Sequence, residues 1–349
     1  MTAMDGKKTD IKSLPFAGVE EYIAGLGEKK FRAKQLYEWM HVHKAASYGE
    51  MTNLPKSLRR QLDEETDYTC LRQVDCQISR QDGTRKYLFA LADGNMVESV
   101  LMRYHHGNSV CISSQVGCRM GCRFCASTLD GLERNLAPSE MLDQIYRIER
   151  DIGERVSNVV VMGTGEPLDN YDNLLTFIRM LTDEHGCHIS QRNVTVSTCG
   201  IVPRIRQLAE EKLQITLALS LHASNQKKRL ELMPIARTYD ISQVLDACAF
   251  YFQGTGRRVT FEYSLVEGVN DAPEQALELA HLLAGMHGHV NLIPVNPIKE
   301  RSYAASRPAS VHRFQNILEK NGINVTIRRE LGADIDGACG QLRRRYKER

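Results

Sequence analysis

The feature that most constrains the fold is a regular alternation of short β-branched runs with amphipathic stretches, which begins near residue 109. The runs SVCISS, SNVVVMG and NVTVSTCG are each followed by a stretch with apolar residues at helical spacing, and QITLALSLH, RRVTFEYSLV, HVNLIPVN and INVTIRRE continue the series. Strands that alternate with helices pair in parallel. Residues 109–330 therefore predict an α/β fold, a partial (βα)6 barrel that resembles part of a TIM barrel.

The remaining segments predict three smaller parts. Residues 1–80 contain two helical patterns, FRAKQLYEWMHVH and TNLPKSLRRQL, and predict a small helical domain. Residues 81–108 place a DG turn between two β-rich runs, which predicts a linking β-hairpin. Residues 331–349 form a C-terminal loop and a basic tail. Because functional groups of parallel α/β folds gather at the C-terminal ends of the strands, the residues after each strand are the first candidates for a site.

Charge and composition exclude several classes of protein. The 45 Lys and Arg residues nearly balance the 43 Asp and Glu residues, so any surface for nucleic acid must be local. No apolar run approaches the roughly 20 residues of a membrane span, and the N-terminus lacks the apolar region of a signal peptide. We expect a soluble, cytoplasmic protein without a membrane partner, whose ten cysteines are buried residues, metal ligands or reactive thiols.

Three of these cysteines form a compact cluster in the loop after the first strand of the predicted barrel, at Cys118, Cys122 and Cys125. A structural zinc ion takes four protein ligands, and no fourth Cys or His follows at zinc-finger spacing. Four-iron clusters are usually held by four cysteines, so three would leave one iron open to a cofactor or substrate. The alternatives are a zinc site and three ordinary buried thiols.

The Cys-x3-Cys-x2-Cys spacing of CRMGCRFC resembles the radical S-adenosylmethionine superfamily. This resemblance implies one [4Fe-4S] cluster with three cysteine ligands and S-adenosylmethionine on the open iron. The segment Gly163-Thr-Gly-Glu-Pro167 is similar to the superfamily's GGEP motif, so Gly165 and Glu166 are implied to bind the methionine amine. Five residues near strand ends are predicted to contact the same cofactor, although each could instead cap the next helix: Ser197, Ser220, Leu221, His222 and Asn296.

Two further cysteines narrow the resemblance. Cys111 in SVCISSQVGC and Cys339 in DIDGACGQLRRR, together with MVESV, LMPI and HVNLIPVN, resemble the bacterial radical RNA (adenine-C2)-methyltransferases over about residues 90–345. That family implies methylation of adenosine 2503 in 23S rRNA and of adenosine 37 in tRNAs. It also implies two S-adenosylmethionine molecules per turnover and an external one-electron reductant such as flavodoxin or ferredoxin.

The family mechanism implies a role for each of three side chains. An adenine carbon is too weak a nucleophile to attack a sulfonium methyl, so Cys339 would carry the methyl group. Cys111 would release the RNA by forming a transient disulfide with Cys339, and Glu98 would act as the base. A lone Glu in a strand is more often solvated surface. Neighbouring arginines, Arg343 to Arg345, would favour a thiolate at Cys339 if they fold close to it.

Local basic clusters are the candidates for RNA contact, although such runs are commonly solvated helix faces. They are Lys29, Lys30, Arg32 and Lys34 around Phe31; Lys56, Arg59 and Arg60; Lys227, Lys228 and Arg229; and the tail LRRRYKER. Two rival functions stay open. A sister class methylates carbon 8 of the same ribosomal adenine, although Gly165-Glu166-Pro167 and Pro294-Val295-Asn296 favour carbon 2. A non-catalytic RNA-binding or redox-sensing iron–sulfur protein would need neither Cys111 nor Cys339.

Overall fold

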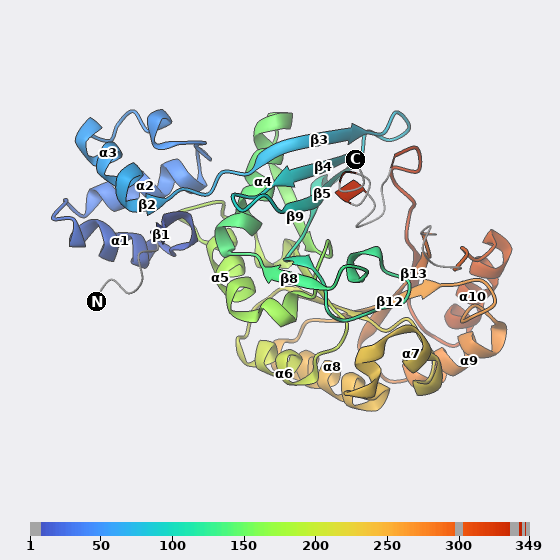
Figure 1. Cartoon of the computed structure of the whole chain (residues 1–349). Helices are drawn as coiled ribbons and strands as arrows, with labels where there is room; N and C mark the ends of the chain where they lie inside the picture. The colour runs from blue at the N-terminus through green and yellow to red at the C-terminus, as the bar shows by residue number, and fades with distance from the viewer. Residues whose placement is uncertain (1–7, 297–302, 336–341, 344–345, 347–349) are drawn as a thin grey trace.

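A single large sheet organises the computed structural model, which describes residues 8–296, 303–335, 342–343 and 346 (Figure 1). Its strand order is β14-β13-β12-β11-β10-β9-β6-β5-β4-β3. Neighbouring strands from β14 to β6 are parallel, which confirms the α/β class. The parallel strands are β6 (Gly107–Ile112), β9 (Val156–Val161), β10 (Val194–Thr198), β11 (Thr216–Ser220), β12 (Val259–Leu265), β13 (Gly288–Pro294) and β14 (Val325–Ile327).

Helices between the parallel strands pack around the outside of the sheet (Figure 1). They are α4 (Pro138–Ile152), α5 (Tyr171–Thr182), α6 (Val202–Glu210), α7 (Gln226–Leu232), α8 (Ile241–Thr255), α9 (Pro273–Leu282) and α10 (Pro308–Lys320). Proline occupies one of the first two positions of α4, α6, α9 and α10, where its missing N–H has no helical partner to lose. No helix in the described ranges is both long and apolar enough to cross a membrane.

The sheet is curled: strands that are far apart in the strand order line one and the same cavity. Val100 and Met102 of β5, Cys111 of β6 and Pro294 of β13 share its wall, with Arg328 beyond the end of β14. A flat sheet would keep β5 and β13 on opposite sides of the five strands between them. The predicted partial barrel is therefore confirmed.

The sheet continues past β6 as an antiparallel extension. Strands β4 (Arg85–Ala90) and β5 (Met96–Tyr104) form the hairpin predicted within residues 81–108. A further strand, β3 (Arg72–Ile78), pairs with β4, although the sequence placed these residues in the helical N-terminal part. Its sequence RQVDCQI is mostly polar and it lies at the edge of the sheet, so the apolar alternation that marks a buried strand is missing.

The N-terminal unit contains helices α1 (Phe16–Gly25), α2 (Phe31–His41) and α3 (Lys56–Glu65), with short parallel strands β1 (Thr9–Asp10) and β2 (Thr66–Asp67). A buried ion pair joins this unit to helix α4 of the barrel. Lys12 is fully buried, and its Nζ lies 2.5 Å from Asp143 Oδ1 and donates to the Thr69 carbonyl at 2.7 Å. The other Asp143 oxygen accepts the Leu71 N–H at 2.7 Å, so both carboxylate oxygens are satisfied.

Candidate functional site

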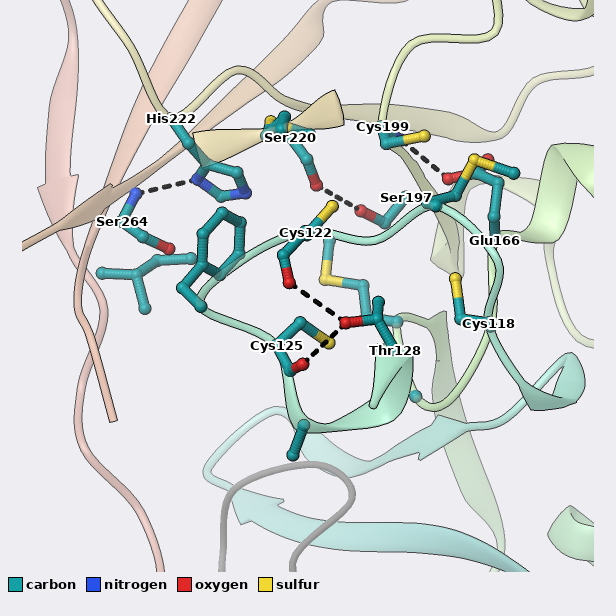
Figure 2. Close-up of a pocket in the computed structure, with 18 of the residues that line it drawn as sticks. Cys118, Cys122, Cys125, Thr128, Glu166, Ser197, Cys199, Ser220, His222 and Ser264 are labelled. Atoms are coloured by element: carbon teal, nitrogen blue, oxygen red, sulfur yellow. Dashed lines mark hydrogen bonds between the residues drawn. The ribbon is translucent and has the colours of Figure 1, made fainter. Parts of the chain in front are cut away.

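The cysteine triplet lies on a loop that begins at a small hairpin, which the sequence did not predict. Strands β7 (Gln115–Gly117) and β8 (Leu132–Asn135) pair in antiparallel fashion at the two ends of this segment. Gly117 has φ +77°, and a Cβ there would overlap the Gly131 carbonyl oxygen, which accepts the Cys118 N–H at 2.8 Å. The Thr128 hydroxyl donates to the carbonyls of Cys122 and Cys125 (Figure 2). The loop is therefore fixed at both ends.

Cys118, Cys122 and Cys125 line one wall of a cavity of about 260 Å³ at the C-terminal ends of the strands (Figure 2). Burial raises the pKa of Cys118 to about 12 and raises the pKa of Cys122 well above its ordinary value. Such thiols become thiolates when they bind a metal centre, because metal binding displaces the proton. Within the described part of the chain, no three ligating side chains surround a single metal-ion position.

Glu166 and Gly165, after strand β9, line this cavity as well, and Glu166 lies near Cys118 and Cys199 (Figure 2). The buried Glu166 carboxylate accepts the Cys199 N–H at 2.7 Å and the Leu168 N–H at 3.1 Å, and its own N–H donates to Gln115. Burial raises the pKa of this carboxyl group. Gly165 has φ +112°, and a Cβ there would lie 2.6 Å from Gln115 Cβ, so no larger residue fits this turn.

The predicted strand-end residues converge on the same cavity, with one exception. Ser197, Ser220, His222 and Asn296 all line it, and the Ser197 and Ser220 hydroxyls are 3.4 Å apart. His222 Nδ1 accepts the Ser264 N–H at 2.9 Å, and burial lowers the pKa of the ring to about 3, so the imidazole is neutral. The side chain of Leu221 is instead fully buried in the hydrophobic core. Successive residues of an extended segment face opposite sides, which explains the exception.

A second cavity, of about 390 Å³, adjoins the first and contains Cys111. The two cavities share the wall formed by Ile293, Val295, Asn296 and Arg328. Cys339 lies outside the described residues, but the chain shortly before it, through Ile335, lines this second cavity. The structure therefore places Cys111 in a cavity beside the first one, and described residues between Arg328 and Ile335 line the same cavity as Cys111.

Glu98 lines neither cavity. Its buried carboxylate lies 3.0 Å from Nζ of the fully buried Lys86 and accepts the Arg343 N–H at 2.6 Å. The Arg343 side chain is also buried and lies 3.9 Å from Glu133. Glu98 thus binds the backbone four residues after Cys339 in the sequence and is not a solvated surface residue.

Sequence reasoning missed one thiol in the cofactor cavity. Cys199 is not among the candidate residues chosen from the sequence, yet it lines this cavity together with the triplet. It is 5% exposed and packs in one small apolar cluster with Cys122 and Met233. Its position directly after strand β10 was the signal that could have found it.

The prediction that Arg229 belongs to an RNA-contacting basic cluster is wrong. Arg229 is fully buried, and its guanidinium donates to the Cys199 carbonyl at 2.7 Å and to the Tyr239 carbonyl at 3.4 Å. Leu232, three residues later, is buried as well, so both residues occupy the inner face of α7. The neighbouring Lys227 is exposed, so it lies on the solvent-facing side of α7.

Comparison with known families agrees with this geometry. The Radical SAM superfamily model matches residues 112–280, a range that contains the cysteine loop, Glu166 and the strand ends from Ser197 to His222. The model of the Ribosomal RNA large subunit methyltransferase N-terminal domain matches residues 9–67, which contain β1, the three N-terminal helices and β2. The fold and the site therefore define a radical S-adenosylmethionine enzyme, with a [4Fe-4S] cluster and S-adenosylmethionine as its cofactors.

Relatives match almost the whole chain. The Probable dual-specificity RNA methyltransferase RlmN of Lachnospira eligens is 65% identical over 97% of this chain and 97% of its own. The protein of the same description from Lachnoclostridium phytofermentans is 60% identical over 98% and 96%. The crystal structure of a radical SAM methyltransferase from Sphaerobacter thermophilus superposes with a TM-score of 0.92 at 43% identity, covering 95% of this chain and 98% of that one. The chain belongs to the RlmN family of radical SAM RNA methyltransferases, which confirms the predicted resemblance and enzyme class.

Proposed function

We propose that this enzyme methylates carbon 2 of adenosine 2503 in 23S rRNA and of adenosine 37 in tRNAs, in the cytoplasm. One observation carries the proposal: the cysteine triplet, Glu166 and the strand-end residues line one cavity, and Cys111 lines the next across a shared wall. Both relatives are named dual-specificity RNA methyltransferases, which supports two kinds of RNA substrate. We place the domain boundaries at residues 80, 108 and 330, as the sequence predicts. In this division a hairpin connects the RNA-binding N-terminal unit to the catalytic barrel.

The residues of the first cavity fit the proposed cofactors. The buried thiols of Cys118 and Cys122 and the half-buried thiol of Cys125 share its wall, and the buried guanidinium of Arg229 behind them leaves its Nε without a hydrogen-bond acceptor in the described structure. Cys118, Cys122 and Cys125 would hold the cluster. The following residues would bind S-adenosylmethionine, used twice per turnover: Gly165, Glu166, Ser197, Ser220, Leu221 through its backbone, His222 and Asn296. When bound, the cluster supplies the electron that cleaves S-adenosylmethionine to a 5′-deoxyadenosyl radical, and flavodoxin or ferredoxin would deliver that electron.

Three residues of the chain would carry the methyl group to the RNA. Cys339 takes the methyl of one S-adenosylmethionine on Sγ, because the aromatic carbon cannot attack a sulfonium. This S-methyl group would lose one hydrogen atom to a radical from a second S-adenosylmethionine, and the resulting carbon radical would add to carbon 2 of the adenine. This adduct would lose one electron to the oxidised cluster and Glu98, which contacts the backbone four residues after Cys339, would take the carbon 2 proton, so that a methylene joins Cys339 to the RNA. Cys111 would then attack the Cys339 sulfur, and the released carbon would gain a proton to become the methyl group, leaving a disulfide between the two cysteines that a reductant reopens.

Replacing Cys339 with alanine should abolish methyl transfer and leave the iron content unchanged. The thiol is the proposed carrier, whereas the cluster ligands lie elsewhere in the chain. In the wild type, mass spectrometry of the anaerobically purified enzyme should detect an added methyl or methylene on the tryptic peptide that contains Cys339. Product analysis of the RNA should place the new methyl on carbon 2.

The matched control is Cys70→Ala, which removes an exposed thiol that lines neither cavity. It should keep both the modification at Cys339 and the methyl transfer. An unmodified Cys339 in a wild-type enzyme that holds its cluster and has been given S-adenosylmethionine contradicts the carrier mechanism. A methyl group on carbon 8 would instead assign the enzyme to the sister class.

Replacing Lys29, Lys30 and Lys34 with glutamate should weaken RNA binding about tenfold or more near 0.1 M salt. Each lost phosphate contact lowers the RNA affinity and also makes that affinity less dependent on salt. Lys29, Lys30 and Lys34 are exposed around Phe31, whose side chain is 50% exposed. The Arg32 guanidinium lies 4.7 Å from the centre of the Phe31 ring. Lysines beside an exposed aromatic ring can bind phosphates while the ring stacks on a base. The test is RNA binding by the triple Lys→Glu variant across a series of salt concentrations.

The control for this test is Lys320→Glu, an exposed lysine at the end of α10 on the barrel. It should leave RNA affinity and its salt slope close to those of the wild type. Unchanged affinity of the triple variant at low salt would show that this surface does not hold the RNA.

A further inference from the structure

Arg229 is a positive charge buried without a negative partner in the described structure. Its side chain is fully buried, and none of the ion pairs among the described residues includes it. Two of its nitrogens donate to neutral backbone carbonyls, and Nε has no acceptor there. Burying an uncompensated charge is costly, so such a residue calls for an anionic neighbour that protein atoms alone do not supply.

The segment that carries Arg229 is attached directly to the cysteine loop. The Leu232 carbonyl, at the end of α7, accepts the Arg123 N–H from between Cys122 and Cys125 at 2.9 Å. Leu232 and Met233 share an apolar cluster with Cys122 and Cys199. Since Arg229 Nη2 donates to the carbonyl of Cys199, the guanidinium lies behind the wall that holds Cys122.

An occupied cysteine loop supplies the missing negative charge. Three thiolates outweigh the positive charge of an oxidised four-iron core, and one-electron reduction adds a further negative charge. A fixed cation in a low-dielectric surrounding stabilises the more negative state the most. Arginine suits this position because its guanidinium stays charged when buried and can bind two carbonyls at once.

We propose that Arg229 is the counter-charge of the iron–sulfur cluster, and that it raises the cluster's reduction potential so that the electron donor can reduce it. The inference rests on the proposed ligation by Cys118, Cys122 and Cys125. It assigns Arg229 an electrostatic role in a reduction step, through charge rather than through contact with substrate.

The test compares three variants of the anaerobically reconstituted holoenzyme by potentiometric titration, with the reduced cluster followed by electron paramagnetic resonance. Arg229→Gln keeps hydrogen-bond donors and removes the charge. At a fixed potential its ratio of reduced to oxidised cluster should fall at least tenfold, which is about 59 mV for a one-electron couple. Arg229→Lys keeps the charge, because the anionic cluster holds the ammonium group beside it protonated, and it should stay within about threefold of the wild type. Lys227→Gln removes an exposed charge two residues away on the same helix and should cause no change.

Each outcome decides the proposal. A Gln variant with full iron content and the wild-type potential overturns it, and so does a Lys variant that shifts as far as the Gln variant, because hydrogen-bond geometry would then be the cause. If the Gln variant loses its cluster, the Lys variant decides: a wild-type potential supports the proposal and a tenfold fall overturns it. A wild-type enzyme that binds no cluster would contradict the three-cysteine ligation itself, which separates that failure from a failure of this inference.

Discussion

Replacing Cys122 with alanine should remove the iron–sulfur cluster and reduce methyl transfer below detection. With three cysteines as the proposed ligands, the two thiols that remain could not hold a four-iron cluster, and no electron would then reach S-adenosylmethionine. Iron and sulfide per protein should fall from about four to near zero in anaerobically reconstituted samples. The far-ultraviolet circular dichroism should stay close to that of the wild type, because Cys122 lies in a loop between the β7–β8 pair and not in the core of the sheet.

Two other buried cysteines provide the controls. Cys199→Ala removes a thiol that lines the same cavity, and Cys248→Ala removes a thiol on the buried face of helix α8. Both variants should keep their iron. If Cys199→Ala loses the cluster as completely as Cys122→Ala, the cluster has four protein ligands, and the open coordination position required for S-adenosylmethionine disappears.

The second large effect is expected at Gly117, just before Cys118, the first of the three proposed cluster ligands. Gly117→Ala should destabilise the protein by about 3 kcal/mol or more, since it combines a left-handed backbone with overlap on a neighbouring carbonyl group. The added Cβ would also lie 3.1 Å from the Gly131 carbonyl carbon, whose oxygen accepts the Cys118 N–H. The Cys118 backbone would have to move, so cluster content should fall as well. Denaturant unfolding and iron analysis measure the two effects.

Gly131→Ala is the matched control on the opposite side of the same hairpin. Its φ of +71° is similar, but nothing lies within 4 Å of a Cβ built there. We expect only the backbone cost of about 1–2 kcal/mol, with iron retained. Equal effects of the two substitutions would show that conformational strain alone matters, and that the close approach of Gly117 to Gly131 does not.

The parallel strands and the cysteine triplet could be predicted because each leaves a local signal. Buried strands such as SNVVVMG are nearly continuous β-branched runs, and the helices between them carry apolar residues at helical spacing. The convergence of Ser197, Ser220 and His222 with the triplet follows from topology, because parallel strands end on the same side. Strand β3 and the β7–β8 hairpin are short or polar, and they form only because a partner strand is present.

Arg229 and Cys199 show what sequence alone does not contain. In the sequence Arg229 is the third of three consecutive basic residues. Only the orientation of α7 relative to the cysteine loop places its side chain in the interior. Cys199 resembles any small apolar residue after a strand until the fold places it beside Cys122. Such assignments depend on which face of a helix or strand is covered. Contacts between residues that are distant in the chain decide that.

The buried ion pair between Lys12 and Asp143 has a consequence for how RNA is selected. Lys12 and Asp143, with their hydrogen bonds to Thr69 and Leu71, hold the N-terminal unit against helix α4, which follows directly on the cysteine hairpin. The distance from the exposed Phe31 surface to the two cavities is therefore fixed. Under the function proposed above, an RNA held at Phe31 would enter only by bending and unstacking until one adenine spans that distance, so the shape of the RNA would select it.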